Sequence, residues 1–241
     1  MRSCEIFGIE VSIGTREELF SAVKACLRRG GRVATVNPLM LMSARESAEF
    51  FSVLSSFELR IPDGYGITLA AAMLGEKTEV LSGVELGKML LSEGGVSLAL
   101  VGALPGVAKE AMRRLRAEFP SLSEAFVFDG YSYTVSELKE SLSRTRPRLA
   151  YFCLSSPKQE LLIAKVHAAS PHTLYIGLGG SLDVYSGRVK RAPKFVRTLH
   201  LEWLWRAVLE PKRFLKIPRL FVFLYRVFRE KRELLTKKSG G

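Results

Sequence analysis

Short β-rich runs alternate with helical patterns along most of the chain, and this alternation limits the possible folds more than any other feature. We expect strands at 32–36, 58–61, 96–101, 125–128, 149–154 and 174–176. The patterns between them predict helices near 16–29, 39–54, 67–74, 84–92, 106–118, 136–143 and 157–168. Alternating elements of this kind build mainly parallel sheets with helices on both faces. The sequence therefore predicts a Rossmann-like α/β fold.

The positive charge lies at the C-terminal end of the chain. Residues 1–187 carry 20 basic and 20 acidic side chains, whereas residues 188–241 carry 16 and 4, which accounts for the net charge of +12. We divide the chain into an α/β domain, residues 1–196, that holds the candidate site, and a basic, amphipathic, helical appendage, residues 197–241. The appendage interleaves cations with bulky aromatic residues: Trp203, Trp205, Phe214, Phe221, Phe223, Tyr225 and Phe228.

Aromatic rings beside cations suit a segment that lies on an anionic membrane surface. A C-terminal helix packed on the domain, or a contact in a homo-oligomer, would explain the same pattern. No uncharged stretch is long enough to cross a bilayer without interruption. The chain start shows no signal-peptide pattern, and the three cysteines form no CxxC pair. We therefore expect a cytoplasmic protein that binds the membrane surface peripherally.

Polar, glycine-rich turns follow the predicted strands, and ligands of parallel α/β folds bind at these carboxyl ends. All three aspartates of the chain, Asp63, Asp129 and Asp183, lie in such turns. Asp129 suits a purely structural role equally well, because aspartate side chains often bond the backbone of turns. Asp63 has Gly64 and Gly66 beside it, and glycines allow a ligand to approach the backbone closely.

We expect neither a metal nor a cofactor. The carboxylates are not clustered as a magnesium or manganese site requires, and the three histidines form no ligand pattern. Phosphate groups would then be bound by backbone N–H groups, helix N-termini and basic side chains. The turns from Gly102 to Gly106 and from Gly177 to Gly180 are candidates, although neither matches GxGxxG or GxxxxGK[ST].

The segment Ser156-Pro-Lys-Gln159 has two interpretations. Serine followed three residues later by glutamine fits a capping box at a helix start. Alternatively, Lys158, Gln159 and Glu160 cluster at a helix N-terminus that faces the candidate site, where they would bind a sugar or a phosphate.

Taken together, these turns resemble the WecG/TagA/CpsF family of bacterial glycosyltransferases. The matching motifs run in order along nearly the whole chain: Thr35-Val-Asn37, Pro62 to Gly66, Val101 to Val107, Asp129 to Tyr131, Pro157 to Glu160, Gly179 to Asp183, Gly187, Arg191 to Pro193, Leu201 to Arg206 and Glu210 to Arg213. The chain departs from the family pattern at Ser155 and Ser156, and at His200, where the family often has glycine.

The resemblance implies a metal-independent, inverting transfer of a sugar from a UDP donor to a lipid-diphosphate-linked N-acetylglucosamine at the inner face of the cell membrane. The transferred sugar would be N-acetylmannosamine, as in wall teichoic acid assembly, or its uronic acid, as in enterobacterial common antigen. Other members use a different UDP-hexose in capsule or exopolysaccharide synthesis. The resemblance also implies that the appendage completes the site at the membrane.

The match of Pro62 to Gly66 to a family motif implies that Asp63 is the general base. The resemblance also implies which residues would contact the donor or the acceptor: Thr35, Asn37, Gly64, Gly66, Lys158, Gln159 and Glu160. The nucleotide would be held by Gly102, Gly180 and Asp183. Guanidinium groups match the geometry of a departing diphosphate, and the candidates are Arg191, Arg206 and Arg213.

Two non-enzymatic alternatives use the basic appendage alone: a nucleic-acid-binding module and a membrane scaffold. Neither gives the ordered polar turns of the neutral domain a role. We therefore expect a glycosyltransferase, and no nucleic-acid partner.

Overall fold

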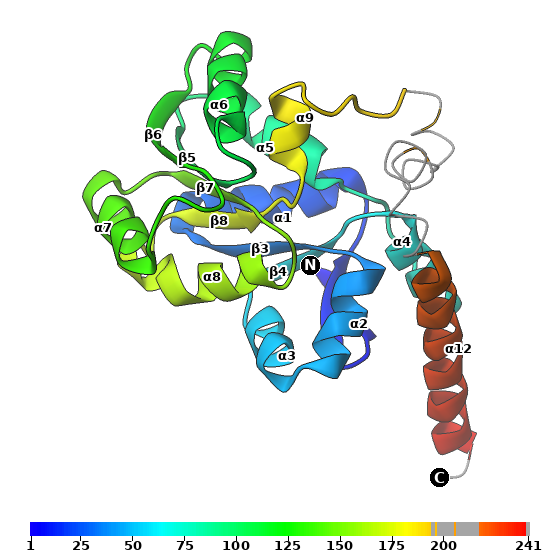
Figure 1. Ribbon diagram of the computed structural model, residues 1–241. Coiled ribbons are helices and arrows are strands. Elements are labelled where there is room, and N and C mark those ends of the chain that lie inside the picture. The colour runs from blue at the N-terminus through cyan, green and yellow to red at the C-terminus, as the bar shows by residue number, and fades with distance from the viewer. Residues whose placement is uncertain (194–195, 197–204, 206–216, 240–241) are drawn as a thin grey trace.

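A six-stranded parallel sheet forms the centre of the computed structural model, which describes residues 1–193, 196, 205 and 217–239 (Figure 1). Its strands follow the order β4-β3-β8-β7-β5-β6, and all neighbours run parallel. The strands are β3 (Gly31–Val36), β4 (Leu59–Pro62), β5 (Ser97–Gly102), β6 (Ser123–Phe128), β7 (Leu149–Cys153) and β8 (Leu174–Gly177). The α/β prediction is confirmed, and every predicted strand ends within two residues of its observed limits.

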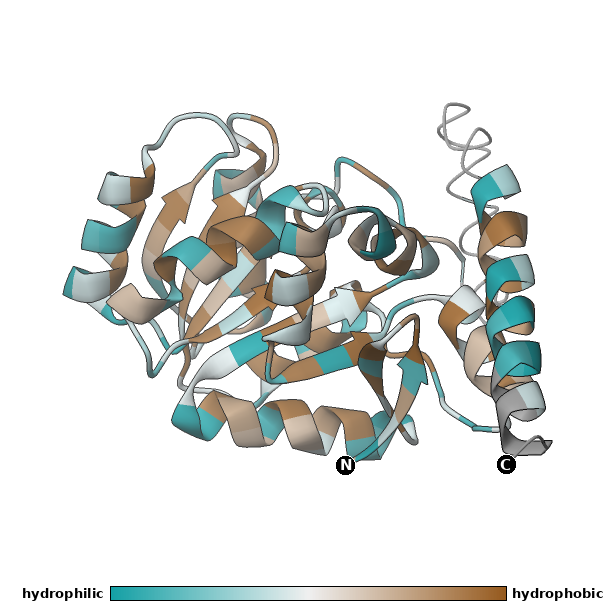
Figure 2. Ribbon diagram, turned by 90° about the horizontal axis from the view of Figure 1, so that it is seen from below, coloured by the Kyte–Doolittle hydropathy of each residue, from teal (hydrophilic) through white to brown (hydrophobic). Residues whose placement is uncertain are grey.

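Helices cover both faces of the sheet, because strand side chains alternate between two buried clusters. In β7, Ala150 and Phe152 enter one cluster, and Leu149 and Tyr151 enter the other. The first face is covered by α2 (Pro38–Glu46), α3 (Ala48–Ser55), α7 (Val135–Thr145) and α8 (Lys158–Val166). The second is covered by α1 (Arg16–Arg29), α5 (Gly83–Ser92), α6 (Val107–Glu118) and α9 (Ser181–Tyr185). Figure 2 shows the hydrophobic strands enclosed between these layers.

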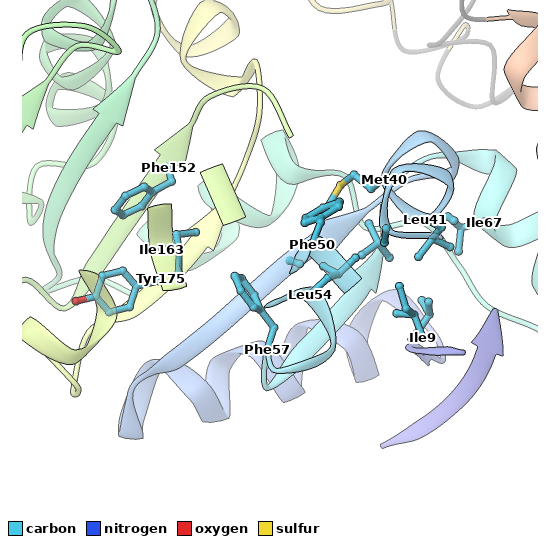
Figure 3. Close-up of a cluster of buried hydrophobic side chains, with 14 of the residues drawn as sticks. Ile9, Met40, Leu41, Phe50, Leu54, Phe57, Ile67, Phe152, Ile163 and Tyr175 are labelled. Carbon is cyan, nitrogen blue, oxygen red and sulfur yellow. The ribbon is translucent and has the colours of Figure 1, made fainter. Parts of the chain in front are cut away.

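The core on the first face is built from aromatic and branched side chains, shown in Figure 3. It joins α2, α3 and α8 to the sheet and to α4 (Tyr65–Met73). The labelled members are Ile9, Met40, Leu41, Phe50, Leu54, Phe57, Ile67, Phe152, Ile163 and Tyr175.

The N-terminus forms a hairpin that the sequence analysis did not predict. Strands β1 (Arg2–Ile6) and β2 (Ile9–Ile13) pair antiparallel, and β2 packs beside β4. Phe7 and Gly8 make the turn, and both have positive φ values, 56° and 78°. Hairpin turns with two positive φ values normally use asparagine, aspartate or glycine. A bulky phenylalanine hides that signal.

The predicted helix 39–54 is wrong in one respect, because it is two helices. Ser47 separates α2 from α3 with an extended backbone, φ −138° and ψ 111°. Its side chain accepts a hydrogen bond from Phe50 N and so caps α3. Helix α8 is followed by a short 3₁₀ helix, η1 (His167–Ala169).

The C-terminal helix α12 (Ile217–Ser239) packs against α2 and α4. It buries Phe223 and Val227, and the Phe223 ring meets the Phe7 ring edge-on at 5.6 Å between centroids. The other side of the helix exposes Phe221, Val222, Tyr225 and Phe228. The helical prediction for the appendage is confirmed over residues 217–239, while most of residues 197–216 lie outside the described part of the chain. None of the described helices, α12 included, is long and apolar enough to cross a membrane.

Candidate active site

Asn37 and Asp63 lie side by side at the carboxyl edge of the sheet. They follow Val36 and Pro62, which are paired in the parallel register of β3 and β4. The Asp63 N–H donates to the Val36 carbonyl at 2.8 Å, so the turn carrying the aspartate is bonded to the adjacent strand. The Asp63 residue is half-buried at this edge.

Both glycines after Asp63 are required by the backbone. Gly64 has φ 93° and ψ 150°, a conformation that residues with a side chain rarely adopt. At Gly66, an added Cβ would lie 2.5 Å from Pro38 Cγ, so the start of α4 approaches the start of α2 too closely for any side chain. The close approach at Gly66 joins two helices, and the approach of a ligand to this backbone stays a prediction.

Asn37 caps α2. Its side-chain Oδ1 accepts hydrogen bonds from Leu39 N at 3.0 Å and from Met40 N at 3.1 Å, and Pro38 occupies the first helical position. The oxygen is therefore committed to the helix. The amide nitrogen is the part of this side chain suited to a ligand.

Gly177, the last residue of β8, joins two further predicted residues. The buried Thr35 hydroxyl donates to its carbonyl at 2.8 Å. An added Cβ on Gly177 would lie 2.7 Å from Gln159 Nε2, so only glycine leaves room for that side chain. The sequence analysis includes Gly177 only as the first residue of a candidate phosphate-binding turn, and does not predict that it makes room for Gln159. The available signal was a glycine that ends a buried strand immediately before a polar turn.

Gln159 and Glu160 face the interior. Gln159 Oε1 accepts from Gly179 N at 3.0 Å, and Gln159 Nε2 donates to Glu160 Oε1 at 2.7 Å. The capping-box interpretation is wrong, because Pro157 occupies the cap position and no side chain caps α8. Gln159 is needed in the interior, where it bonds the turn after β8. Lys158 alone of the three clustered residues is exposed.

Glu160 is a fully buried carboxyl group. Burial raises its pKa, while the bonds from Gln159 and nearby groups act in the opposite direction. Its Oε2 has no hydrogen-bond partner of normal geometry among the described residues. No ion pair between described residues includes this side chain.

The predicted nucleotide-binding turns lie along the same edge. Gly102 ends β5 with φ 132°, and an added Cβ would lie within 2.3 Å of the Cys153 carbonyl. Gly180 is exposed after β8, and Asp183 is half-buried in the first turn of α9. Asp129 has the structural role: its Oδ1 accepts from Tyr131 N and Ser132 N at 2.8 Å, and these bonds lower its pKa.

Arg191 is held beside α5. Its Nη2 lies 2.9 Å from Glu85 Oε1 and 3.2 Å from Ser82 Oγ. Arg16 binds the same carboxylate at 3.0 Å. Burial raises the pKa of Glu85, but the two guanidinium groups outweigh burial and lower it. Because an added Cβ on Gly83 would contact Leu178 at 3.3 Å, α5 begins next to the turn after β8.

Arg206 and Arg213 lie outside the described residues. Within the described residues, no group of three or more His, Cys, Asp or Glu side chains is arranged to hold a metal ion. The structure thus gathers Thr35, Asn37, Asp63 and Gln159 at the ends of β4, β3 and β8, with the turn carrying Gly180 directly after β8. Gly102 ends β5, which β7 separates from β8.

In open α/β sheets of this kind, ligands bind at the carboxyl ends of the strands, where these polar residues lie. Residues 4–237 match the family described as Glycosyl transferase WecG/TagA/CpsF, and the chain belongs to this family. It is a glycosyltransferase.

Two curated relatives are similar over most of their length. Both carry the name N-acetylglucosaminyldiphosphoundecaprenol N-acetyl-beta-D-mannosaminyltransferase. The protein of Bacillus spizizenii is 32% identical over 198 residues, and that of Bacillus subtilis is 33% identical over 197 residues. Each alignment covers 79% of this chain and 77% of the relative.

Proposed function

We propose that this glycosyltransferase moves N-acetylmannosamine from a UDP donor to N-acetylglucosaminyl-diphospho-undecaprenol, in the synthesis of teichoic acid or another cell-surface polysaccharide. The observation that carries the proposal is the similarity to two relatives of that printed activity over 198 and 197 residues. The family match, over residues 4–237, includes every described turn of the candidate site.

Asp63 is the general base of the proposed reaction. Its carboxylate takes the proton of the acceptor hydroxyl as that oxygen attacks C1 of the donor sugar. The bond between C1 and the UDP oxygen breaks, and the sugar is transferred with inversion. Such base catalysis typically contributes about 10²- to 10⁴-fold. The Asn37 amide nitrogen lies beside the same turn and is suited to orient a sugar hydroxyl.

The departing UDP carries negative charge that cations must balance. We assign this task to Arg191, Arg206 and Arg213, with no metal. Arg191 is bound to Glu85, and a diphosphate would compete with that carboxylate for the same guanidinium group. Glu85 would keep its second partner, Arg16, after the exchange.

In the proposed reaction, the lipid acceptor is used at the inner face of the cell membrane. The exposed side of α12 carries Phe221, Tyr225 and Phe228, which are 67%, 62% and 48% exposed, together with Arg219, Arg229 and Arg232. Rings and guanidinium groups on one helix surface suit the boundary between acyl chains and phosphates. A homo-oligomer contact is the competing use of this surface.

The deciding experiment measures UDP release from a panel of UDP-sugars in EDTA, with and without a short-chain lipid-diphosphate N-acetylglucosamine. We expect acceptor-dependent release from UDP-N-acetylmannosamine. Release from the UDP-linked uronic acid of N-acetylmannosamine, or from another UDP-hexose, would show that the enzyme uses that donor instead. No release from folded protein supplied with membranes would refute the proposal, and release only after a divalent metal is restored would refute metal independence.

A further inference from the structure

Glu160 is a buried carboxyl group that the proposed chemistry does not use. It is 0% exposed and its Oε2 lacks a hydrogen bond among the described residues. Burying an unpaired charge is costly, so a carboxyl in this position favours the neutral form. An apolar side chain would fill the same space without that cost. The carboxyl therefore calls for a role that an apolar residue cannot perform.

The role follows from the hydrogen bond that Glu160 Oε1 accepts from Gln159. Gly179 N–H can only donate, so the Gln159 atom facing it is the carbonyl oxygen Oε1. The amide nitrogen of Gln159 then has to face Glu160 Oε1, at 2.7 Å. Glu160 thus supplies the acceptor that keeps the carboxamide in this orientation, and Gln159 holds the turn after β8.

The turn in question leads directly into predicted ligand contacts. It runs from Gly177 to Gly180, where Gly180 is exposed, and continues into Asp183 in the first turn of α9. Gly177 leaves the space that both side chains occupy, since an added Cβ would lie 2.7 Å from Gln159 Nε2 and 3.3 Å from Glu160 Oε1. Gly179, with φ 53°, gives the turn its left-handed backbone.

We propose that Glu160 is a positioning residue, which fixes the Gln159 carboxamide and through it holds the turn from Gly177 to Gly180 in the shape that binds the sugar-nucleotide donor. The donor-binding part rests on the proposed function. Glu160 itself touches neither the donor nor the acceptor. The neutral carboxyl and a glutamine amide offer the same acceptor, so Glu160→Gln preserves the contact, whereas Glu160→Met fills the space and removes it.

The test compares these two variants with Ile163→Val, a control in the same helix that loses buried volume but no polar group. Hydrogen exchange at the Gly179 amide reports the turn directly and requires no activity. We expect wild type, Glu160→Gln and Ile163→Val to protect this amide, and Glu160→Met to lose protection while its melting temperature shows a folded protein. Equal protection in Glu160→Met would overturn the proposal.

Kinetics then test the link to the donor. In Glu160→Met we expect KM for the donor to rise by about tenfold or more, with KM for the lipid acceptor little changed, because a displaced turn weakens donor binding. Glu160→Gln should restore the wild-type value. An unchanged donor KM in Glu160→Met, or failure of Glu160→Gln to restore it, would overturn the role. If wild type transfers no sugar at all, the proposed function fails, and Gly179 exchange still decides the positioning role.

Discussion

The backbone N–H of Asp63 donates a 2.8 Å hydrogen bond to the carbonyl of Val36, the residue before Asn37. This bond continues the parallel pairing of β3 and β4 one position past the end of β4, which stops at Pro62. The proposed base therefore lies on a short turn after the edge strand β4, and this bond anchors the turn to the neighbouring strand β3. Such anchoring fits a group that has to meet an acceptor hydroxyl in a defined geometry.

Replacing the proposed base should abolish transfer without unfolding the protein. In Asp63→Asn the backbone bond to Val36 remains, but no carboxylate is left to accept a proton, so we expect kcat to fall by about 10²- to 10⁴-fold. Initial rates with a saturating donor and circular dichroism would measure activity and fold. Asp129→Asn is the matched control, because asparagine can keep the bonds to Tyr131 N and Ser132 N. Near-normal turnover in Asp63→Asn would show that Asp63 is not the general base.

The bond between Thr35 and Gly177 should contribute measurably to stability. Valine at position 35 has nearly the shape of threonine but cannot donate to the Gly177 carbonyl, so Thr35→Val should lower the free energy of unfolding by about 1–3 kcal/mol. Thr35→Ser keeps the hydroxyl and should recover part of the loss. Urea unfolding of the three proteins measures both changes. If Thr35→Val were as stable as wild type, this bond would have no net stabilising effect.

Glu160 should make stability depend on pH. Its raised pKa means that the native state holds a proton that the unfolded chain releases near the ordinary glutamate pKa of about 4.3. Between that value and the raised native pKa the unfolded state binds fewer protons, so the free energy of unfolding falls as pH rises. Glu160→Gln has no such proton and should gain stability relative to wild type across this window. Urea unfolding at a series of pH values measures the difference, and a constant difference would contradict the prediction.

Variants on the two sides of α12 should distinguish the packing of this helix on the rest of the protein from its binding to a membrane. Phe223 is fully buried, so Phe223→Ala should cost about 3–5 kcal/mol and increase hydrogen exchange along α12. Replacing the exposed Phe221, Tyr225 and Phe228 together by serine should leave melting unchanged but reduce co-sedimentation with anionic vesicles. Unaltered vesicle binding in the triple variant would exclude the membrane role of this surface, and a loss of self-association would indicate a homo-oligomer contact.

Much of the fold followed from the sequence because the strands of the parallel sheet are short, apolar and separated by helical patterns. The hairpin of β1 and β2 was not predicted, although Cys4, Ile6, Ile9 and Val11 alternate with polar residues in its two strands. Its turn uses Phe7 with positive φ, held by packing on Phe223 from the far end of the chain and by Arg45 over its ring. Local sequence rules cannot include such a long-range contact.

For the candidate site, the sequence predicted the positions of residues at strand ends but not the orientation of side chains that depend on other elements. Strand ends located Asn37 and Asp63, because their position depends only on where β3 and β4 stop. The inward orientation of Gln159 and Glu160 was beyond prediction, since it depends on the space that Gly177 leaves in another strand. Likewise, the Glu85 carboxylate that holds Arg191 comes from α5, about a hundred residues earlier in the chain.

The edge-on contact between Phe7 and Phe223 also orders events during synthesis. The hairpin turn leaves the ribosome about two hundred residues before the ring that packs against it is translated. Chains generally fold from the N-terminus during synthesis, and a contact of this sequence separation forms late. A nascent chain that stops short of α12 would therefore carry an exposed Phe7, and chaperones that bind apolar surface would distinguish it from the finished protein.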